Sequence, residues 1–377
     1  MLLVSFTAAV GAGLTWRSVL RRLSKRVVTT ARTALDEVDG KGNFARTAAA
    51  FRNTIATGSR FEPEAGRYHL YIAYGCPWAA GTLTALKFKG LQDIIGVSVV
   101  HPTWRRTRPN AKNDKHCGWH FKKPGDAPVA NELGYGANEC DDALVPDTVN
   151  GAATVRDLYE LANDATGKYS TPVLWDKKEG TIVSNESMDI LRIFDGAFDA
   201  LIAHPERKLF KAGELAAAEA LNDFIYPTVN NGVYRCGFAR SQEAYEAAHA
   251  ELFSSLERLE AHLADHHAKG VPFLTGNDFT WIDLRLYHTL VRFDPVYVVY
   301  FKTSLKRIAD FPHLLRFMRD CYAVPAVKES TNMRHIKMHY FTSHTDHNIY
   351  GIIPASNGPP LEHAPSPSTL GSSSSSP

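Results

Sequence analysis

Cysteine is scarce in this sequence, and its five copies follow no recognisable spacing. No two of them form a Cys-x-x-Cys pair, and none shows the spacing of a zinc site. An odd number of scattered cysteines also fits no disulfide framework, which indicates a reducing compartment. The five are Cys76, Cys117, Cys140, Cys236 and Cys321.

Strong net charge is also missing, since the formal net charge is only +2. Residues 1–35 carry six basic residues and no acidic one, whereas the rest of the chain carries 36 basic and 40 acidic residues. A mildly acidic body argues against nucleic-acid binding. The apolar run at residues 1–16 is too short to cross a bilayer, so no membrane span is expected.

Both ends of the chain lack the pattern of a packed domain. Residues 1–40 begin free of acid and rich in arginine, serine and threonine, which is typical of an organelle transit peptide. This predicts a mitochondrial protein, with a plastid or cytoplasmic location as alternatives. A disordered leader without a targeting function is the other interpretation. Residues 355–377 are rich in proline and serine and predict a disordered tail.

The body of the chain is organised around Cys76. A strand-like alternation starts at Tyr68 and stops at Gly75, and Pro77 then suits the first position of a helix that runs to Gly90. Cys76 is therefore expected at a helix N-terminus, where free amides and the helix dipole favour a thiolate. Without a second cysteine, the motif indicates monothiol chemistry through a mixed disulfide, the alternative being a structural cysteine.

The elements that follow predict an α/β domain over residues 41–200. Their order is strand, helix, strand, helix, hairpin and helix, interrupted by a long irregular loop at residues 102–150. This is the element order of a thioredoxin-like fold, with Pro172 at the place of its cis-proline. Residues 205–354 are helical, with one apolar stripe from Tyr245 to Leu263 and a capping box at Thr280. A thioredoxin-like domain followed by an all-α domain is the glutathione transferase architecture.

Five separated motifs narrow this resemblance. They are Cys76-Pro77-Trp78, Thr171-Pro172-Val173-Leu174-Trp175-Asp176, Ser184-Asn185-Glu186-Ser187, Asn230-Asn231-Gly232-Val233-Tyr234 and His335-Ile336-Lys337-Met338-His339-Tyr340. In this order, across residues 42–354, they resemble the glutathionyl-hydroquinone reductases, the omega-like Xi class of glutathione transferases.

The resemblance implies reduction of glutathionyl-hydroquinones with glutathione as co-substrate and no metal. Cys76 would attack the glutathionyl sulfur, and a second glutathione would resolve the mixed disulfide. Tyr234 matches a proton donor, and Tyr297 and Tyr340 match hydroxyls that lower the pKa of the cysteine by hydrogen-bonding its thiolate. For Tyr297 the alternative to a catalytic role is core packing. A homodimer is also implied.

Five residues match glutathione contacts in that family. Thr171 would offer its backbone to the cysteinyl part, and Glu186 and Ser187 would hold the γ-glutamyl end. Trp119 would cover the ligand, and Lys168 stands where bacterial members commonly carry arginine.

Three features depart from the pattern or need another interpretation. Ala80 and Gly81 replace a histidine and an arginine of the family motif, so Cys76 is expected to be less acidic than in relatives. Four histidines could be read as a metal site, but a polar surface segment is favoured: His335, His339, His344 and His347. Cys236 is interpreted as a bystander of Tyr234, the alternative being a resolving thiol.

Two other functions stay open at this point. One is a general thioltransferase or dehydroascorbate reductase, which would use the same cysteine. The other is a non-catalytic binding protein with the transferase fold, although such a protein would need neither Cys76 nor Tyr234.

Overall fold

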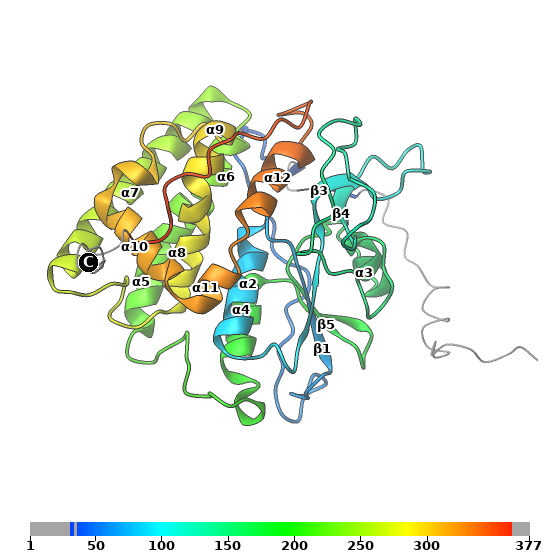
Figure 1. The fold of residues 1–377 in the computed structure, drawn as a ribbon, viewed down its shortest axis with the longest axis horizontal. Helices are drawn as coiled ribbons and strands as arrows, with labels where there is room; N and C mark the ends of the chain where they lie inside the picture. The colour runs from blue at the N-terminus through cyan, green and yellow to red at the C-terminus, as the bar shows by residue number, and fades with distance from the viewer. Residues whose placement is uncertain (1–30, 34–35, 364–377) are drawn as a thin grey trace, which may run out of the picture.

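The computed structural model describes residues 31–33 and 36–363 (Figure 1). Most of the expected leader, and the tail beyond residue 363, lie outside these residues. Residues 355–363 run along the helical part of the molecule, where the Lys337 ammonium donates to the Ala355 carbonyl oxygen over 3.1 Å. None of the helices in the described part is long and apolar enough to cross a membrane.

A mixed four-stranded sheet forms the centre of the N-terminal domain, in the order β2-β1-β5-β6. Strand β2 is parallel to β1, whereas β5 is antiparallel to β1 and β6 is antiparallel to β5. All residues of β1 are buried, because the sheet is covered on both faces. The strands are β1 (Tyr68–Ile72), β2 (Gly96–Val99), β5 (Val173–Asp176) and β6 (Thr181–Ser184).

Helices cover the two faces of this sheet. On one face, α2 (Pro77–Phe88) and α4 (Ser187–Gly196) pack on Leu70, Ile72 and Leu174. On the other, α3 (Val155–Leu161) packs on Tyr71 and Trp175. The Thr171–Pro172 peptide bond is cis, as the sequence predicted. These features confirm the thioredoxin-like domain.

The segment expected to be one long irregular loop contains a two-stranded antiparallel sheet, so that expectation is wrong in part. Its strands are β3 (His101–Arg106) and β4 (Cys117–His120). Strand β3 packs against α12 (Met333–Ser343), where the Thr103 and Thr342 hydroxyls are 2.7 Å apart. Contacts with a helix more than 200 residues away therefore order this segment, which local sequence patterns cannot reveal.

The C-terminal domain is helical. The predicted stripe lies on α7, where Leu252, Leu256, Leu259 and Leu263 are buried. Short π-helical turns at η3 and η4 precede α6 and α9. The elements are η2 (Asp199–Leu201), α5 (Leu215–Ile225), η3 (Tyr226–Asn230), α6 (Gly232–Gly237), α7 (Gln242–Ala268), α8 (Trp281–Arg292), η4 (Phe293–Tyr297), α9 (Val298–Tyr300), η5 (Ile308–Asp310), α10 (Pro312–Tyr322), α11 (Pro325–Glu329) and α12.

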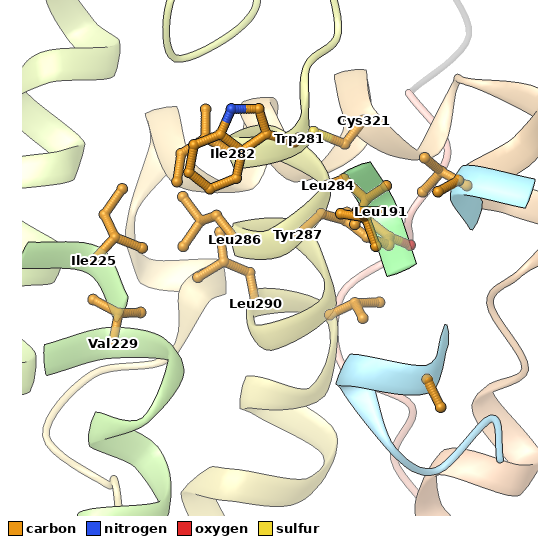
Figure 2. Packing of buried hydrophobic residues seen from close by; sticks show 14 of the residues in the cluster. Leu191, Ile225, Val229, Trp281, Ile282, Leu284, Leu286, Tyr287, Leu290 and Cys321 are labelled. Carbon is orange, nitrogen blue, oxygen red and sulfur yellow. The ribbon is translucent and has the colours of Figure 1, made fainter. Parts of the chain in front are cut away.

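Helix α8 belongs to the helical domain, where it contacts α5 and α10, and it also packs against α2 of the N-terminal domain. Every residue of α8 except Arg285 is buried, as expected for a helix that is surrounded by protein. Figure 2 shows Ile225 and Val229 of the helical domain on one side and Leu191 of α4 on another. The predicted capping box is present, since the Asp283 carboxylate accepts from the Thr280 amide over 2.8 Å.

Candidate active site

Cys76 lies between β1 and α2 and is the N-cap residue of α2. Pro77 occupies the first turn, so the predicted start of the helix is confirmed. The Cys76 thiol donates to the Thr171 carbonyl oxygen over 3.4 Å, next to the cis-proline. The sulfur therefore lies where the helix amides and the cis-proline loop meet.

The pKa of Cys76 differs from the expectation. Burial raises the pKa of the thiol above its usual value and outweighs the groups that lower it. Those groups are the Ala79 amide, the Thr171 side chain, the Arg292 guanidinium and the Trp78 amide, in decreasing order. The helix terminus thus acts as predicted, but desolvation reverses the net direction.

The positive charge near Cys76 comes from Arg292, at the end of α8. Its side chain is fully buried and donates to the Tyr74 carbonyl oxygen over 2.7 Å and to the Gly75 carbonyl oxygen over 3.3 Å. Gly81, in contrast, faces α8, because a Cβ there would lie 3.0 Å from Leu284 Cδ2. In the family motif, the positive charge near the cysteine is carried by residues at positions 80 and 81. In this chain it is carried by Arg292, which belongs to the other domain.

Three tyrosine hydroxyls form a chain beside the sulfur. The hydroxyls of Tyr234 and Tyr340 are 2.7 Å apart, and those of Tyr297 and Tyr340 are 3.1 Å apart. Tyr234 and Tyr340 line the same pocket as Cys76, whereas Tyr297 is fully buried behind Tyr340. The hydrogen bond from Tyr297 or Tyr340 to the thiolate stays a prediction, since the thiol contacts Thr171 here.

The pocket that holds Cys76 is lined mainly by aromatic side chains, and we call it the aromatic pocket. Trp119 of β4 lies 4.4 Å from the His339 ring and meets Trp104 of β3 edge-on at 5.4 Å between ring centroids. Its main lining residues are Cys76, Trp104, Trp119, Tyr234, His339 and Tyr340. An aromatic ring could therefore be held flat within reach of the sulfur.

A second pocket is lined mainly by polar groups, and six of its residues also line the aromatic pocket: Arg32, Arg46, Trp78, Lys168, Ser170 and Thr171. We call it the polar pocket; its main lining residues are Arg46, Lys168, Thr171, Glu186, Ser187 and Arg285. Four of the five predicted glutathione contacts therefore lie together, and Trp119 lies in the aromatic pocket.

Two of these residues are already engaged. The Lys168 ammonium pairs with the Glu37 carboxylate at 2.5 Å, and burial lowers its pKa. Glu186 is the N-cap of α4, and its carboxylate accepts from the Met188 amide over 3.3 Å. Lys168 therefore offers less free charge than the sequence suggested.

Sequence reasoning missed three arginines of the site, which are Arg46, Arg285 and Arg292. Arg285, His288 and Arg292 are spaced by three and four residues in an otherwise apolar segment, which places them on one helical face. Polar residues in such a segment are a signal that could have marked this face as functional. Arg46 gave no comparable signal.

The histidine cluster is not the polar surface segment that the sequence suggested. His335, His339 and His344 are buried, whereas His347 is exposed. No group of metal-ligating side chains occurs among the described residues. Cys236 is buried outside both pockets, and burial raises the pKa of its thiol to about 12.

A cysteine at the N-terminus of the helix that follows a buried strand, a cis-proline and a helical second domain together define a glutathione transferase. Two family models match accordingly, the glutathione S-transferase N-terminal domain over residues 75–197 and the C-terminal domain over residues 242–320. The chain is 43% identical to a glutathionyl-hydroquinone reductase of Escherichia coli strain K12, over 83% of this chain and 88% of that protein. It is 39% identical to a glutathionyl-hydroquinone reductase of Sphingobium chlorophenolicum, over 86% and 93% of the two chains.

Solved structures agree. The glutathione transferase Xi of Phanerochaete chrysosporium matches with a TM-score of 0.73 at 43% identity, covering 86% of this chain and 96% of that chain. A glutathione-bound homologue from Escherichia coli K-12 matches with a TM-score of 0.71 at 40% identity, covering 83% and 94%. The chain therefore belongs to the glutathionyl-hydroquinone reductases, the Xi class of the glutathione transferases.

Proposed function

We propose that this enzyme reduces glutathionyl-hydroquinones to hydroquinones at Cys76, with glutathione as the reductant. The observation that carries the proposal is the position of Cys76 in the aromatic pocket, with its thiol against Thr171, a residue that also lines the polar pocket. A conjugate of a tripeptide and an aromatic ring needs such a pair of pockets, with the sulfur that joins its two halves next to the nucleophile. Two related structures are glutathione complexes, which supports glutathione as the co-substrate.

In the first step, the Cys76 thiolate attacks the glutathionyl sulfur. A sulfur–sulfur bond forms, the bond between sulfur and the aromatic carbon breaks, and its electron pair stays on the carbon. Tyr234, whose hydroxyl lines the aromatic pocket, donates a proton to that carbon. Tyr340 is hydrogen-bonded to Tyr234 and can stabilise the phenolate that remains.

In the second step, the thiolate of a second glutathione attacks the glutathionyl sulfur of the mixed disulfide. Oxidised glutathione leaves, and Cys76 returns as a thiolate. The two steps oxidise two glutathionyl sulfurs to one disulfide and reduce one carbon–sulfur bond to a carbon–hydrogen bond. The chemistry therefore needs no other electron carrier.

Steady-state turnover of a glutathionyl-hydroquinone tests the proposal. Wild type should release hydroquinone, Cys76→Ser should be inactive, and Cys117→Ser should retain activity, because Cys117 lines the same pocket but lies on β4, away from the α2 N-terminus. Activity with small disulfides or dehydroascorbate but none with the conjugate would favour the thioltransferase. Glutathione binding without turnover of any of these substrates would favour a binding protein.

A further inference from the structure

The imidazole ring of His339 forms part of the wall of the aromatic pocket. Its centroid lies 4.4 Å from that of the Trp119 ring and 5.4 Å from that of the Trp104 ring. The Cδ2 edge of the ring lies against the turn before the nucleophile, since Cδ2 would be 2.9 Å from a Cβ at Gly75. These contacts fix the orientation of the ring next to the turn that carries Cys76.

The hydrogen bonds of His339 determine which of its nitrogens carries the proton. Nδ1 lies 3.0 Å from the Pro102 carbonyl oxygen and 3.1 Å from the Ser343 hydroxyl, which itself donates to that carbonyl oxygen. A carbonyl oxygen can only accept, so Nδ1 must be the protonated, donating nitrogen. Nε2 is then an acceptor, and it has no hydrogen-bond partner among residues 31–33 and 36–363. It is the polar atom of this ring that remains for a ligand in the pocket.

Two other histidines line the pocket, but their partners do not fix the tautomer. His116 meets the Thr107 hydroxyl at 2.9 Å, and His344 meets the Tyr300 hydroxyl at 2.7 Å. A hydroxyl can donate or accept, so either ring nitrogen can carry the proton in these two side chains. Of the histidines that the described part of the chain places along this pocket, His339 is the one whose partner can only accept.

The ring of His339 also stays neutral. Burial, with a smaller contribution from the Arg292 guanidinium, lowers the pKa of His339 to about 3. An uncharged imidazole with its proton on Nδ1 keeps a lone pair on Nε2. Nε2 therefore remains an acceptor at neutral pH.

A hydroquinone ring would bring hydroxyl groups into this pocket. Each phenol O–H is a donor, and burying it without an acceptor is unfavourable. The Tyr234 and Tyr340 hydroxyls already form a hydrogen bond with each other, and the indole Nε1 of Trp104 can only donate. His339 Nε2 is thus the acceptor best suited to a ring hydroxyl.

We propose that His339 Nε2 accepts a hydrogen bond from a ring hydroxyl of the glutathionyl-hydroquinone and thereby selects for hydroxyl-bearing aromatic conjugates. This inference rests on the proposed function. The hydrogen bond would fix the rotation of the ring about its carbon–sulfur bond, so that the carbon attached to sulfur keeps one orientation towards Tyr234. His339 then has a role in substrate specificity as well as in the packing of α12.

Calorimetric binding to the Cys76→Ser enzyme, which cannot form the mixed disulfide, tests this inference. The two ligands are the glutathionyl-hydroquinone and S-phenylglutathione, which keeps the tripeptide and the ring but lacks both hydroxyls. Adding His339→Phe should weaken binding of the glutathionyl-hydroquinone about 10-fold and that of S-phenylglutathione by less than about 2-fold, because only the first ligand leaves a buried donor unpaired. Phenylalanine suits the test because the Pro102 carbonyl oxygen keeps the Ser343 hydroxyl as a donor at 3.0 Å.

Two further variants separate the hydrogen bond from packing. His339→Gln carries an amide oxygen that can replace Nε2 as acceptor, so it should recover part of the affinity for the glutathionyl-hydroquinone. His347→Phe is the matched control, since His347 is exposed and lies outside the pocket, and it should leave both affinities unchanged. Circular dichroism confirms that each variant is folded.

Conjugates with a single hydroxyl, ortho or meta to the sulfur, identify the hydroxyl that His339 recognises. At least one of them should show the loss on His339→Phe. Three outcomes would overturn the inference: equal losses for the glutathionyl-hydroquinone and S-phenylglutathione, no loss for either, or no loss for both single-hydroxyl conjugates. In each of these cases turnover by wild type could persist, so the proposed function would stand. A wild type that neither binds nor turns over the conjugate would overturn both.

Discussion

The guanidinium of Arg292 donates a hydrogen bond to the carbonyl oxygen of Tyr74 over 2.7 Å and thereby ties α8 to the turn that carries Cys76. Arg292 is fully buried and pairs with no carboxylate among the described residues. A buried cation is costly unless its surroundings compensate it. Backbone carbonyl oxygens do so in part, and the remaining positive charge of Arg292 lowers the pKa of Cys76.

Replacement of Arg292 should therefore change the titration of Cys76. Arg292→Gln is expected to raise the pKa of the thiol further, whereas Arg292→Lys keeps the charge and should raise it less. Because a higher pKa means less thiolate at a given pH, alkylation of Cys76 by iodoacetamide at pH 7 should be fastest in wild type, slower in Arg292→Lys and slowest in Arg292→Gln. The measurement is the alkylation rate as a function of pH.

Other ionisable groups that face Arg292 should not obscure this profile. They are Tyr287 and His288 on α8, Tyr297 on η4, and His339 and Tyr340 on α12. Burial lowers the pKa of His339 to about 3 and raises that of Tyr340 well above its usual value. A single rise with pH is expected, and an Arg292→Gln profile identical to wild type would contradict the role of this charge.

The tyrosine chain predicts a graded series of variants. Tyr234→Phe should lower kcat by about 10²-fold or more, the usual contribution of a positioned proton donor. Tyr340→Phe should cost less, because it removes only a partner of Tyr234, and Tyr297→Phe should cost least, because Tyr297 is fully buried and does not line the pocket. Single-turnover release of hydroquinone measures all three, and an equal loss in Tyr297→Phe and Tyr234→Phe would contradict this order.

Close packing at Gly75 predicts a stability defect next to the nucleophile. A Cβ at Gly75 would lie 2.4 Å from His339 Cβ, so Gly75→Ala must push α12 away from the turn. A cost of about 1–3 kcal/mol in the free energy of unfolding is expected from such overpacking. Gly213→Ala is the control, since a Cβ there meets nothing within 4 Å. Equal urea midpoints for the two variants would show that the contact is not tight.

The basic leader predicts a mitochondrial location, which a fusion protein can test. Residues 1–40 joined to a fluorescent protein should carry it into mitochondria, whereas a fusion with Arg17, Arg21, Arg22, Lys25 and Arg26 changed to glutamine should stay in the cytosol. Import into plastids, or a cytosolic location of the unchanged fusion, would contradict the prediction. Fluorescence microscopy with organelle markers is the measurement.

Local patterns in the sequence were enough for the elements that frame the site. Pro77 after Cys76 marked the start of α2, and the Thr280 and Asp283 pair marked the start of α8. Both depend on residues that are close together in the chain, whereas the cis bond at Pro172 was predicted from the element order of a thioredoxin-like fold. Local patterns also singled out Cys76, and the resemblance to a known family then added its tyrosines, two of which line the same pocket.

Long-range contacts were out of reach of the same reasoning. Strand β3 is ordered by α12, and the charge beside Cys76 comes from Arg292, more than 200 residues later. The net pKa of Cys76 depends on burial, which a motif does not encode. The same reason explains the error on the three buried histidines. Histidine is a polar residue type, which suggested a surface position, whereas these side chains are buried.

Intact mass spectrometry after one exposure of the enzyme to a glutathionyl-hydroquinone, with no free glutathione present, tests the central claim most directly. The account predicts a mass increase of one glutathionyl group on Cys76, release of one equivalent of hydroquinone, and loss of the adduct when glutathione is added. Cys76→Ser should show neither adduct nor release. Turnover of the conjugate with full activity in Cys76→Ser, or with the adduct on another residue, would contradict the account.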